Sequence, residues 1–220
     1  MKERPILFSA EMVRAILDGR KTQTRRIMKL PDLEWKQVVQ LDGVYEWILW
    51  STKSEANIET THKYYKAGDG IPCPYGKPGD RLWVRETFQL TEPSGSVGDE
   101  WIGDTQSELD YIPKERPESL GYWIYLRFRA DDHDMCSWWR PSIFMPRWAS
   151  RITLEIANIR VERVRDITHE DAIAEGMPNE YPVTPITAYL GLWDHINGKG
   201  SWDANPWVWV VEFKRVEGAL

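Results

Sequence analysis

A chain of 220 residues with a formal net charge of -6 can bury a sizeable core, and its acidic balance argues against a general nucleic-acid coat, which would be basic overall. Its two cysteines, Cys73 and Cys136, do not make a disulfide framework, so a reducing cytoplasm is the expected location. No signal-peptide core and no apolar run of membrane-spanning length occurs, so we expect a single domain over residues 1–220 that does not enter a membrane.

The chain opens with a predicted strand, Arg4–Ser9, followed by a short amphipathic helix that ends near Asp18. Ser9 suits the N-cap, because its hydroxyl can accept a hydrogen bond from the first turn. Gly19 suits the end of the helix, because glycine adopts the left-handed cap conformation at little cost. The residues after Gly19 are therefore expected to leave the helix in a turn.

Period-two alternation and runs of β-branched and aromatic residues predict the remaining strands. Asp42-Gly43 is a turn signal, so the stretch before it is expected to form a hairpin with the strand that follows. Asn158 is expected to mark a bulge. The predicted strands are Val44–Trp50, Arg81–Phe88, Tyr122–Arg129, Ser150–Ile156, Ile159–Val164 and Trp207–Val216.

Two further helices are predicted in the C-terminal third of the chain. Thr168 and Asp171 resemble a capping box, and the helix that they open is expected to end at Gly176. A second helix is predicted near Thr187–Asn197. Its expected buried face consists of Tyr189, Leu190, Trp193 and Ile196.

The turn after the first helix is dense in charge. The seven residues from Arg20 to Arg26 contain four cations and two threonines. Cations beside small hydroxyls, just past a helix end, suit an anionic or polar ligand. A solvated basic turn is the alternative that composition leaves open.

Several stretches of the chain resemble the ASCH family. Ile6-Leu-Phe-Ser9 and Gly19-Arg-Lys-Thr-Gln-Thr-Arg-Arg26 are similar to the opening signature of that family, and the whole chain is similar to the longer ASCH proteins of phages and prophages. The resemblance implies a PUA-like fold, which is an α/β (α+β) protein with a mixed β-barrel, short helices at its mouth and, here, two insertions near 29–75 and 90–120. The supporting stretches are Lys77–Glu86, Trp139–Arg147 and Trp207–Phe213.

The resemblance also implies a candidate activity. The family includes an amidohydrolase that removes the acetyl group from N4-acetylcytidine by means of a lysine, a threonine and a glutamate. Its Gly-Arg-Lys-Thr-x-Thr motif places the first two on Lys21 and Thr24. The glutamate falls on Glu175, with Glu170 and Asp171 as neighbouring alternatives.

These residue types suit amide hydrolysis, which needs a nucleophile, a proton acceptor and a stabiliser of the oxyanion. A desolvated lysine could take the proton of the threonine hydroxyl or, when charged, stabilise the oxyanion. The glutamate could protonate the leaving amine or orient water. The alternative is that Thr22 and Thr24 begin a strand while Lys21 faces solvent. Because Lys21 follows a helix end in a polar turn, its loss is expected to cost little stability.

Arginines near tryptophans are candidates for contacts with phosphate and with a nucleobase. The planar guanidinium suits phosphate oxygens, and aromatic rings stack on bases. Arg26 and Arg147 are predicted to form a phosphate-facing rim, whereas ordinary core packing is the alternative for the tryptophans. The predicted ligand-binding residues are Arg20, Arg25, Arg26, Arg140, Arg147 and Trp139.

No metal pattern and no Gly-rich phosphate loop stands out in the sequence, so neither a metal nor a cofactor is expected. The predicted partner is a nucleoside or single-stranded RNA, with a modified base as one form. Three functions stay open: hydrolysis of an acylated cytidine, non-catalytic reading of RNA or a modified base, and a ribonuclease activity, which the family also includes. An open basic groove would favour the reader, whereas a closed pocket for one base would favour the hydrolase.

Overall fold

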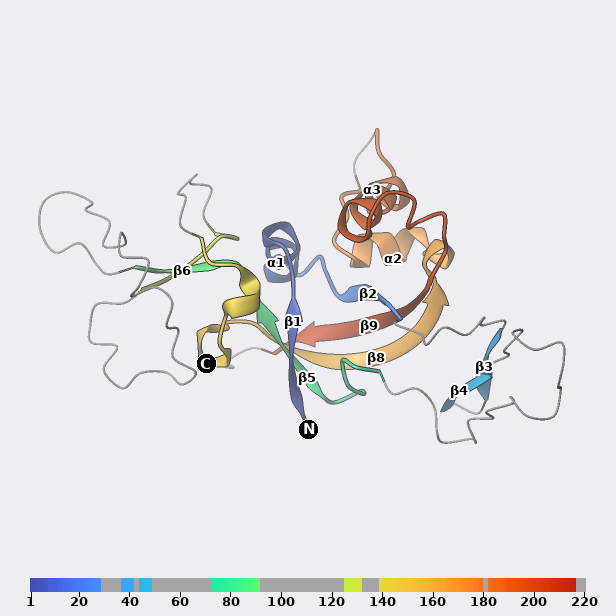
Figure 1. Cartoon of the computed structure of the whole chain (residues 1–220), viewed down its shortest axis with the longest axis horizontal. Helices are drawn as coiled ribbons and strands as arrows, with labels where there is room; N and C mark the ends of the chain where they lie inside the picture. Colours follow the sequence, from blue (N-terminus) through green and yellow to red (C-terminus); the bar gives the residue numbers. More distant parts are fainter. Residues whose placement is uncertain are drawn as a thin grey trace, which may run out of the picture.

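The computed structural model describes residues 1–28, 37–41, 44–48, 73–91, 125–131, 139–179 and 182–216. Its centre is a five-stranded mixed sheet in the order β1-β5-β8-β9-β2 (Figure 1). The first two strands in this order run parallel, and the other neighbours are antiparallel. The strands are β1 (Glu3–Leu7), β5 (Arg81–Arg85), β8 (Thr153–Arg163), β9 (Trp207–Arg215) and β2 (Gln23–Ile27).

The mixed α+β class expected from the sequence is confirmed, whereas a closed barrel is not seen among the described strands. β1 and β2 are the two edges of the sheet, and no backbone pairing joins them in the described residues. A side chain links the two edges instead, because Arg26 Nη2 donates a hydrogen bond to the Leu7 carbonyl oxygen at 2.6 Å. The sheet is therefore an open one whose edges approach each other at the end of β1.

β8 is the longest strand and is joined to both β5 and β9. Its register with β9 shifts between Ile156 and Asn158, which confirms the predicted bulge. The bulge also merges the two predicted strands of this region into one. A bulge bends a strand and increases its twist, and this bend lets β8 pair with β5 at one end and with β9 along its length.

Two two-stranded antiparallel sheets accompany the central sheet. β3 (Gln37–Leu41) pairs with β4 (Val44–Ile48), the pairing expected of the predicted hairpin. β6 (Phe88–Thr91) pairs with β7 (Tyr125–Phe128). Most of the two expected insertions, 29–75 and 90–120, lies outside the described residues.

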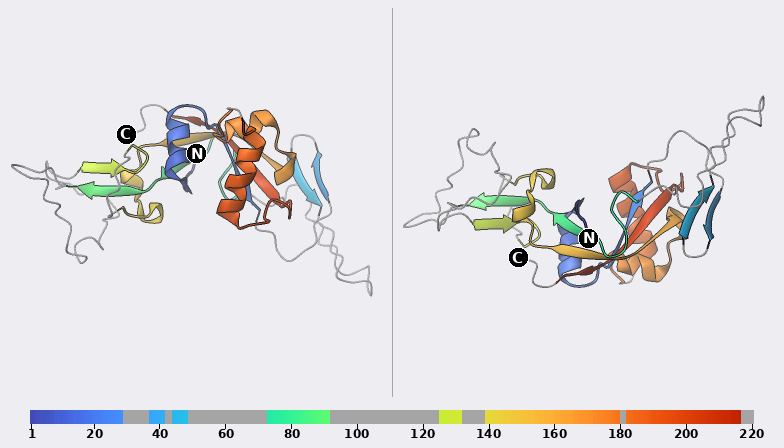
Figure 2. Two further views of the ribbon diagram at one scale, coloured as in Figure 1. Left: turned by 90° about the horizontal axis from the view of Figure 1, so that it is seen from above. Right: turned by 90° about the horizontal axis from the view of Figure 1, so that it is seen from below.

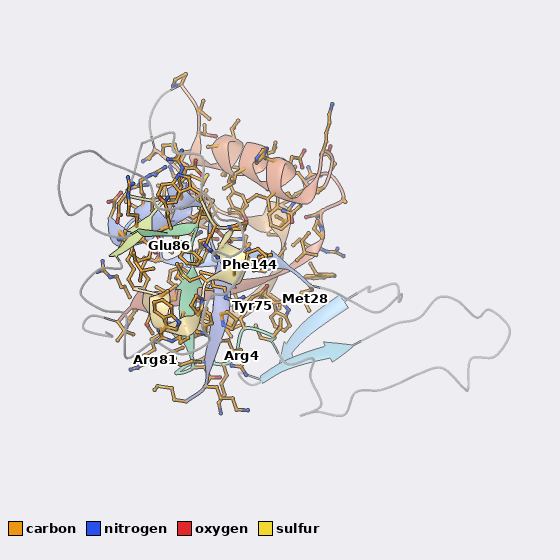
Figure 3. All side chains as sticks on the ribbon, turned by 60° about the vertical axis from the view of Figure 1, so that its left-hand side comes forward. Arg4, Met28, Tyr75, Arg81, Glu86 and Phe144 are labelled. Carbon is orange, nitrogen blue, oxygen red and sulfur yellow. The ribbon has the colours of Figure 1, made fainter. Side chains whose placement is uncertain are left out.

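The sequence prediction of one strand over Arg81–Phe88 is wrong, because the chain leaves the sheet at Glu86. Figure 3 shows Arg81 and Glu86 at opposite ends of β5. Glu86 is fully buried, and both its carboxylate oxygens accept hydrogen bonds from Arg151, at 2.9 and 3.0 Å. Burial raises the pKa of Glu86, and the Arg151 guanidinium only partly offsets this. A buried carboxylate needs such a partner, so the turn is fixed at this residue and β6 starts afterwards.

Three α-helices of the described residues accompany the central sheet: α1 follows β1, and α2 and α3 lie together beside β9 (Figures 1 and 2). Ser9 caps the first of them by accepting a hydrogen bond from Met12 N. Thr168 and Asp171 form the predicted capping box of the second, and Thr184 caps the third. The helices are α1 (Ala10–Leu17), α2 (His169–Ala174) and α3 (Pro185–Asn197), and three short 3-10 turns are η1 (Ser142–Phe144), η2 (Arg147–Ala149) and η3 (Val164–Asp166). No described helix is both long and apolar enough to span a membrane.

The core has two main parts, and α3 contributes to one of them. One cluster packs α1 against β1, β5 and β8, with Val13, Leu82 and Val84 fully buried. The other packs α2 and α3 against the sheet. Two residues of the predicted buried face of α3, Tyr189 and Trp193, are indeed buried. The other two are corrected by the structure, because Leu190 and Ile196 are 37% and 61% exposed.

Candidate functional site

The basic turn is held between the ends of two helices. After α1, Gly19 adopts a φ of +74°, which reverses the chain direction. The Lys21 backbone N–H then donates to the Ala15 carbonyl at 2.9 Å, and the Thr22 N–H donates to the Ala174 carbonyl at 2.8 Å. The turn thereby joins the end of α1 to the end of α2, and residues 154 positions apart in the chain become neighbours.

Lys21 and Glu175 form a buried ion pair in this turn. Lys21 Nζ donates to Glu175 Oε2 at 2.7 Å and to the Glu175 carbonyl oxygen at 2.9 Å. Each residue is only 3% exposed. Burial lowers the pKa of Lys21, and the attraction of the Glu175 carboxylate offsets part of this shift. An ammonium group has three donors, so one donor remains for a ligand.

Gly176 is what allows Glu175 to reach Lys21. Its φ is +92°, and a Cβ at this position would lie 3.0 Å from the Ala15 Cβ and 3.3 Å from the Lys21 Cβ. Any other residue would therefore be strained in its backbone and crowded against α1. The close contact between the two helix ends depends on the absence of a side chain here.

Lys21 and Glu175 line a cavity of about 110 Å³, which we call the Lys21 cavity. Thr24 also lines it and is 4% exposed. We find no hydrogen-bond partner for the Thr24 hydroxyl in the part of the chain that the structure describes. Three aromatic residues, Phe8, Tyr189 and Trp193, belong to the wall. The remaining lining residues are Leu7, Ser9, Met12, Arg25, Arg26, Ile27, Leu192, Ile196 and Asn197.

Arg25, which lines the cavity, is held by a network of ion pairs. The Arg25 side chain is completely buried, and its Nη2 donates to Asp171 Oδ2 at 2.8 Å and to Glu162 Oε2 at 3.0 Å. Its Nη1 lies 3.5 Å from Glu175 Oε1. Burial favours a higher pKa for Asp171, but the hydrogen bond from Gln23 and the charge of Arg25 outweigh it and hold the pKa below its ordinary value.

Arg160 extends this network along β8. Its guanidinium contacts the carboxylates of Glu162, Glu212 and Asp171. This network was not predicted from the sequence, because Asp171 was considered for a helix cap or for the catalytic carboxylate, and the charged strand residues were not paired. One signal was present in the sequence: Gln23 and Arg25, like Arg160 and Glu162, lie two positions apart and so share one face of a strand.

Among the predicted ligand-binding arginines, the structure brings two to the cavity and places the others elsewhere. Arg25 and Arg26 line it, and the Arg26 guanidinium lies 5.3 Å from the Phe8 ring centroid. Arg20 does not line it and pairs with Asp18 at 2.9 Å. Arg147 also lies outside it and pairs with Glu3 at 2.9 Å, so the predicted rim of Arg26 and Arg147 is not assembled.

The remaining two predicted ligand contacts belong to the region of β6 and β7. Arg140 pairs through its backbone with Phe88. The Trp139 ring lies 6.0 Å from the Arg127 guanidinium carbon and 5.6 Å from that of Arg129. Neither Arg140 nor Trp139 lines the Lys21 cavity. These two residues therefore do not contribute to the candidate site.

Within the described residues, no group of three or more His, Cys, Asp or Glu side chains is arranged to hold a metal ion. The carboxylates of Glu162, Asp171 and Glu175 instead surround the Arg25 guanidinium. Cys136 lies outside the described residues, and Cys73 is a free thiol whose pKa is raised by burial.

Comparison of the chain with protein-family models, curated proteins and solved structures finds no match. Two features of the chain point to a function: the sequence motif of the basic turn, and the geometry that the fold gives to it. Both lead to the same small set of residues, namely Lys21, Thr24 and Glu175, which line one cavity.

Proposed function

We propose that this chain is an ASCH-type protein of the PUA-like class that binds one nucleobase in the Lys21 cavity and hydrolyses the acyl amide of an N4-acylated cytidine. One observation carries the proposal: a buried Lys21–Glu175 pair shares a cavity with a buried threonine, Thr24, whose hydroxyl no described group engages. A nucleophile, a base and a third group that orients the base form the arrangement used in covalent amide hydrolysis. The resemblance of the Gly19–Arg26 stretch to the amidohydrolase motif supports the same assignment.

The dimensions of the cavity favour a single base over a strand of RNA. A cavity of about 110 Å³ is similar in scale to the engineered protein cavities of roughly 150 Å³ that bind one benzene ring. Aromatic residues in the wall suit a flat ring. Arg20 and Arg147, which were predicted to contact phosphate, are paired with Asp18 and Glu3. A small site with room for one ring suits a nucleoside hydrolase.

In the proposed reaction, neutral Lys21 accepts the proton of the Thr24 hydroxyl while the Thr24 oxygen attacks the acyl carbonyl carbon. Glu175 stabilises the ammonium that forms, because its carboxylate is already within 2.7 Å of Lys21 Nζ. Lys21 then delivers that proton to the cytosine amino nitrogen, and the C–N bond breaks. Water hydrolyses the acyl ester on Thr24 by the same proton transfers in reverse, which releases the carboxylic acid and restores the hydroxyl.

A non-catalytic reader of modified bases is the second candidate function. The observation that favours it is the number of contacts already made by Lys21, which donates to both the carboxylate and the carbonyl oxygen of Glu175. A lysine in this state can serve as a fixed structural charge that shapes the cavity. The reader would bind the same ligands without changing them.

The experiment that separates these functions uses the purified full chain and mass spectrometry of the products. The substrates are N4-acetylcytidine, other acylated nucleosides, and a short single-stranded RNA. We expect cytidine and acetate from N4-acetylcytidine and intact RNA. Binding without any product would favour the reader, whereas cleaved RNA would favour a ribonuclease, and either result would contradict the hydrolase proposal.

A further inference from the structure

Tyr189 of α3 is a buried phenol that the proposed reaction has not yet used. It is 3% exposed and lines the Lys21 cavity. We find no hydrogen-bond partner for its hydroxyl among the described residues, and its ring packs in the core cluster of α2 and α3. The hydroxyl of a tyrosine in a cavity wall, when no protein group engages it, is a group that a ligand can engage.

The charges around Tyr189 keep its hydroxyl protonated. Burial raises the pKa of the phenol well above its ordinary value of 10.0, and the Glu175 carboxylate adds to the shift. Arg25 and Arg26 act in the opposite direction, and the raised pKa shows that burial and Glu175 outweigh them. The hydroxyl therefore acts as a hydrogen-bond donor at neutral pH.

The position of the ring is fixed by two tryptophans. The Tyr189 ring centroid lies 6.1 Å from that of Trp193, one turn further along α3, and 6.3 Å from that of Trp202 in an edge-on arrangement. Both tryptophans are buried. A donor held rigidly in a water-poor site needs no reorganisation when charge develops on an acceptor, and such donors contribute strongly to catalysis.

The proposed hydrolysis requires a donor for the oxyanion of its tetrahedral intermediate. Lys21 is engaged with Glu175 and serves as the base, so a second group is needed. We propose that the Tyr189 hydroxyl donates a hydrogen bond to the acyl carbonyl oxygen of the bound nucleoside, and that it both recognises the acyl group and stabilises the oxyanion. This inference rests on the proposed function of the Lys21 cavity. It predicts that the preferred ligand is a nucleoside with an acylated base, bound with its acyl carbonyl oxygen facing α3.

The first test is Tyr189→Phe, which removes only the hydroxyl. We expect kcat for N4-acetylcytidine to fall about 100-fold, as is typical for the loss of one oxyanion donor, while KM changes much less. The matched control is Tyr75→Phe, because Tyr75 is partly buried but does not line the cavity. Thermal unfolding of both variants checks the fold. A kcat equal to that of the wild type would overturn the inference.

A second test does not depend on turnover. Trp fluorescence titrations compare the affinity of N4-acetylcytidine and of cytidine for Thr24→Val and for the double variant Thr24→Val/Tyr189→Phe. We expect Thr24→Val to prefer the acetylated nucleoside by about tenfold, the scale of one hydrogen bond to a buried group. The double variant should lose that preference.

The two tests distinguish failure of this inference from failure of the proposed function. If the wild type releases no acetate but the preference exists and disappears with Tyr189→Phe, hydrolysis is contradicted and recognition by Tyr189 stands. If the preference persists in the double variant, the role of Tyr189 is contradicted whatever the turnover. If Thr24→Val binds neither nucleoside, or binds both equally, the inference is overturned.

Discussion

Lys21 Nζ lies 2.7 Å from Glu175 Oε2, in a turn where each residue is only 3% exposed. The two residues come from the end of α1 and the end of α2, and a backbone bridge joins them as well. A buried charge without its partner is costly. The pair therefore determines both the chemistry of the cavity and the stability of the contact between the two helix ends.

The first prediction concerns stability. Lys21→Ala should lower the free energy of unfolding by about 3–5 kcal/mol, because it leaves the Glu175 carboxylate buried without its ammonium partner. This reverses the expectation from sequence that the loss of Lys21 would be inexpensive, which assumed a solvated turn. Urea unfolding measures the change. The control is Arg20→Ala, whose ion pair with Asp18 is exposed and should contribute less than about 1 kcal/mol. Equal costs for the two variants would contradict the structural role of the pair.

The second prediction concerns pH. Burial lowers the pKa of Lys21 below its ordinary value of 10.5, so between the two values the unfolded chain binds more protons and this group makes the protein more stable as pH rises. A neutral Lys21 is also the active base, so kcat should rise with pH through the same pKa. Glu175→Gln removes the attraction that partly offsets burial and should move this rise to lower pH. A pH–rate profile that is unmoved, or moved to higher pH, would exclude Lys21 as the base.

The third prediction concerns Gly176 and has a matched control in the same chain. Gly176→Ala should destabilise the protein and weaken catalysis, because it places a Cβ 3.0 Å from the Ala15 Cβ and moves Glu175 away from Lys21. Gly198 has a similar φ of +99°, but a Cβ there would meet no atom within 4 Å. Gly198→Ala should therefore cost only the backbone strain, about 1–3 kcal/mol. Thermal unfolding and turnover of the two variants should differ, and identical behaviour would remove Gly176 from the site.

The fourth prediction concerns acid unfolding. The pKa of Asp171 is held below its ordinary value of 3.8, because the Gln23 hydrogen bond and the Arg25 and Arg160 charges outweigh the effect of burial. Its contribution to stability is thus present above pH 3.8 and is lost as pH falls through the lowered pKa. Asp171→Asn should reduce stability near neutral pH, and its difference from the wild type should shrink in acid. Asp166→Asn, at an exposed position, should change neither the stability near neutral pH nor its loss in acid. A constant difference across pH would argue against this network.

Local periodicity predicted much of the fold. The strands β4, β8 and β9, the bulge at Asn158, and the capping box of α2 depend on residues close in sequence, and the structure confirms them. The motif of the basic turn was sufficient to identify Lys21 and Thr24 as candidates. The partner of Lys21 lies 154 residues away. No spacing rule predicts that contact, and only the family resemblance suggested Glu175.

Other features depended on tertiary packing and were missed or misjudged. Polar strand residues were not considered as possible partners of one another, so the buried cluster around Arg25 was not predicted. Its strand residues do alternate along β2 and β8, which places them on one face of each strand. The predicted buried face of α3 was too wide, because Leu190 and Ile196 are exposed while Tyr189 and Trp193 are buried. A barrel requires the two edge strands to pair along their backbones. In the described residues, Arg26 joins these edges through its side chain instead.

The most direct test of the account is the release of cytidine from N4-acetylcytidine by the wild type, Thr24→Val and Thr22→Val, measured side by side. Valine keeps the shape of threonine and removes the hydroxyl oxygen. Thr22 is an exposed threonine of the same turn, so Thr22→Val makes the same chemical change, hydroxyl to methyl, at a position outside the cavity. We predict that the wild type and Thr22→Val release cytidine at similar rates and that Thr24→Val releases none. Equal rates for Thr24→Val and Thr22→Val would contradict the account.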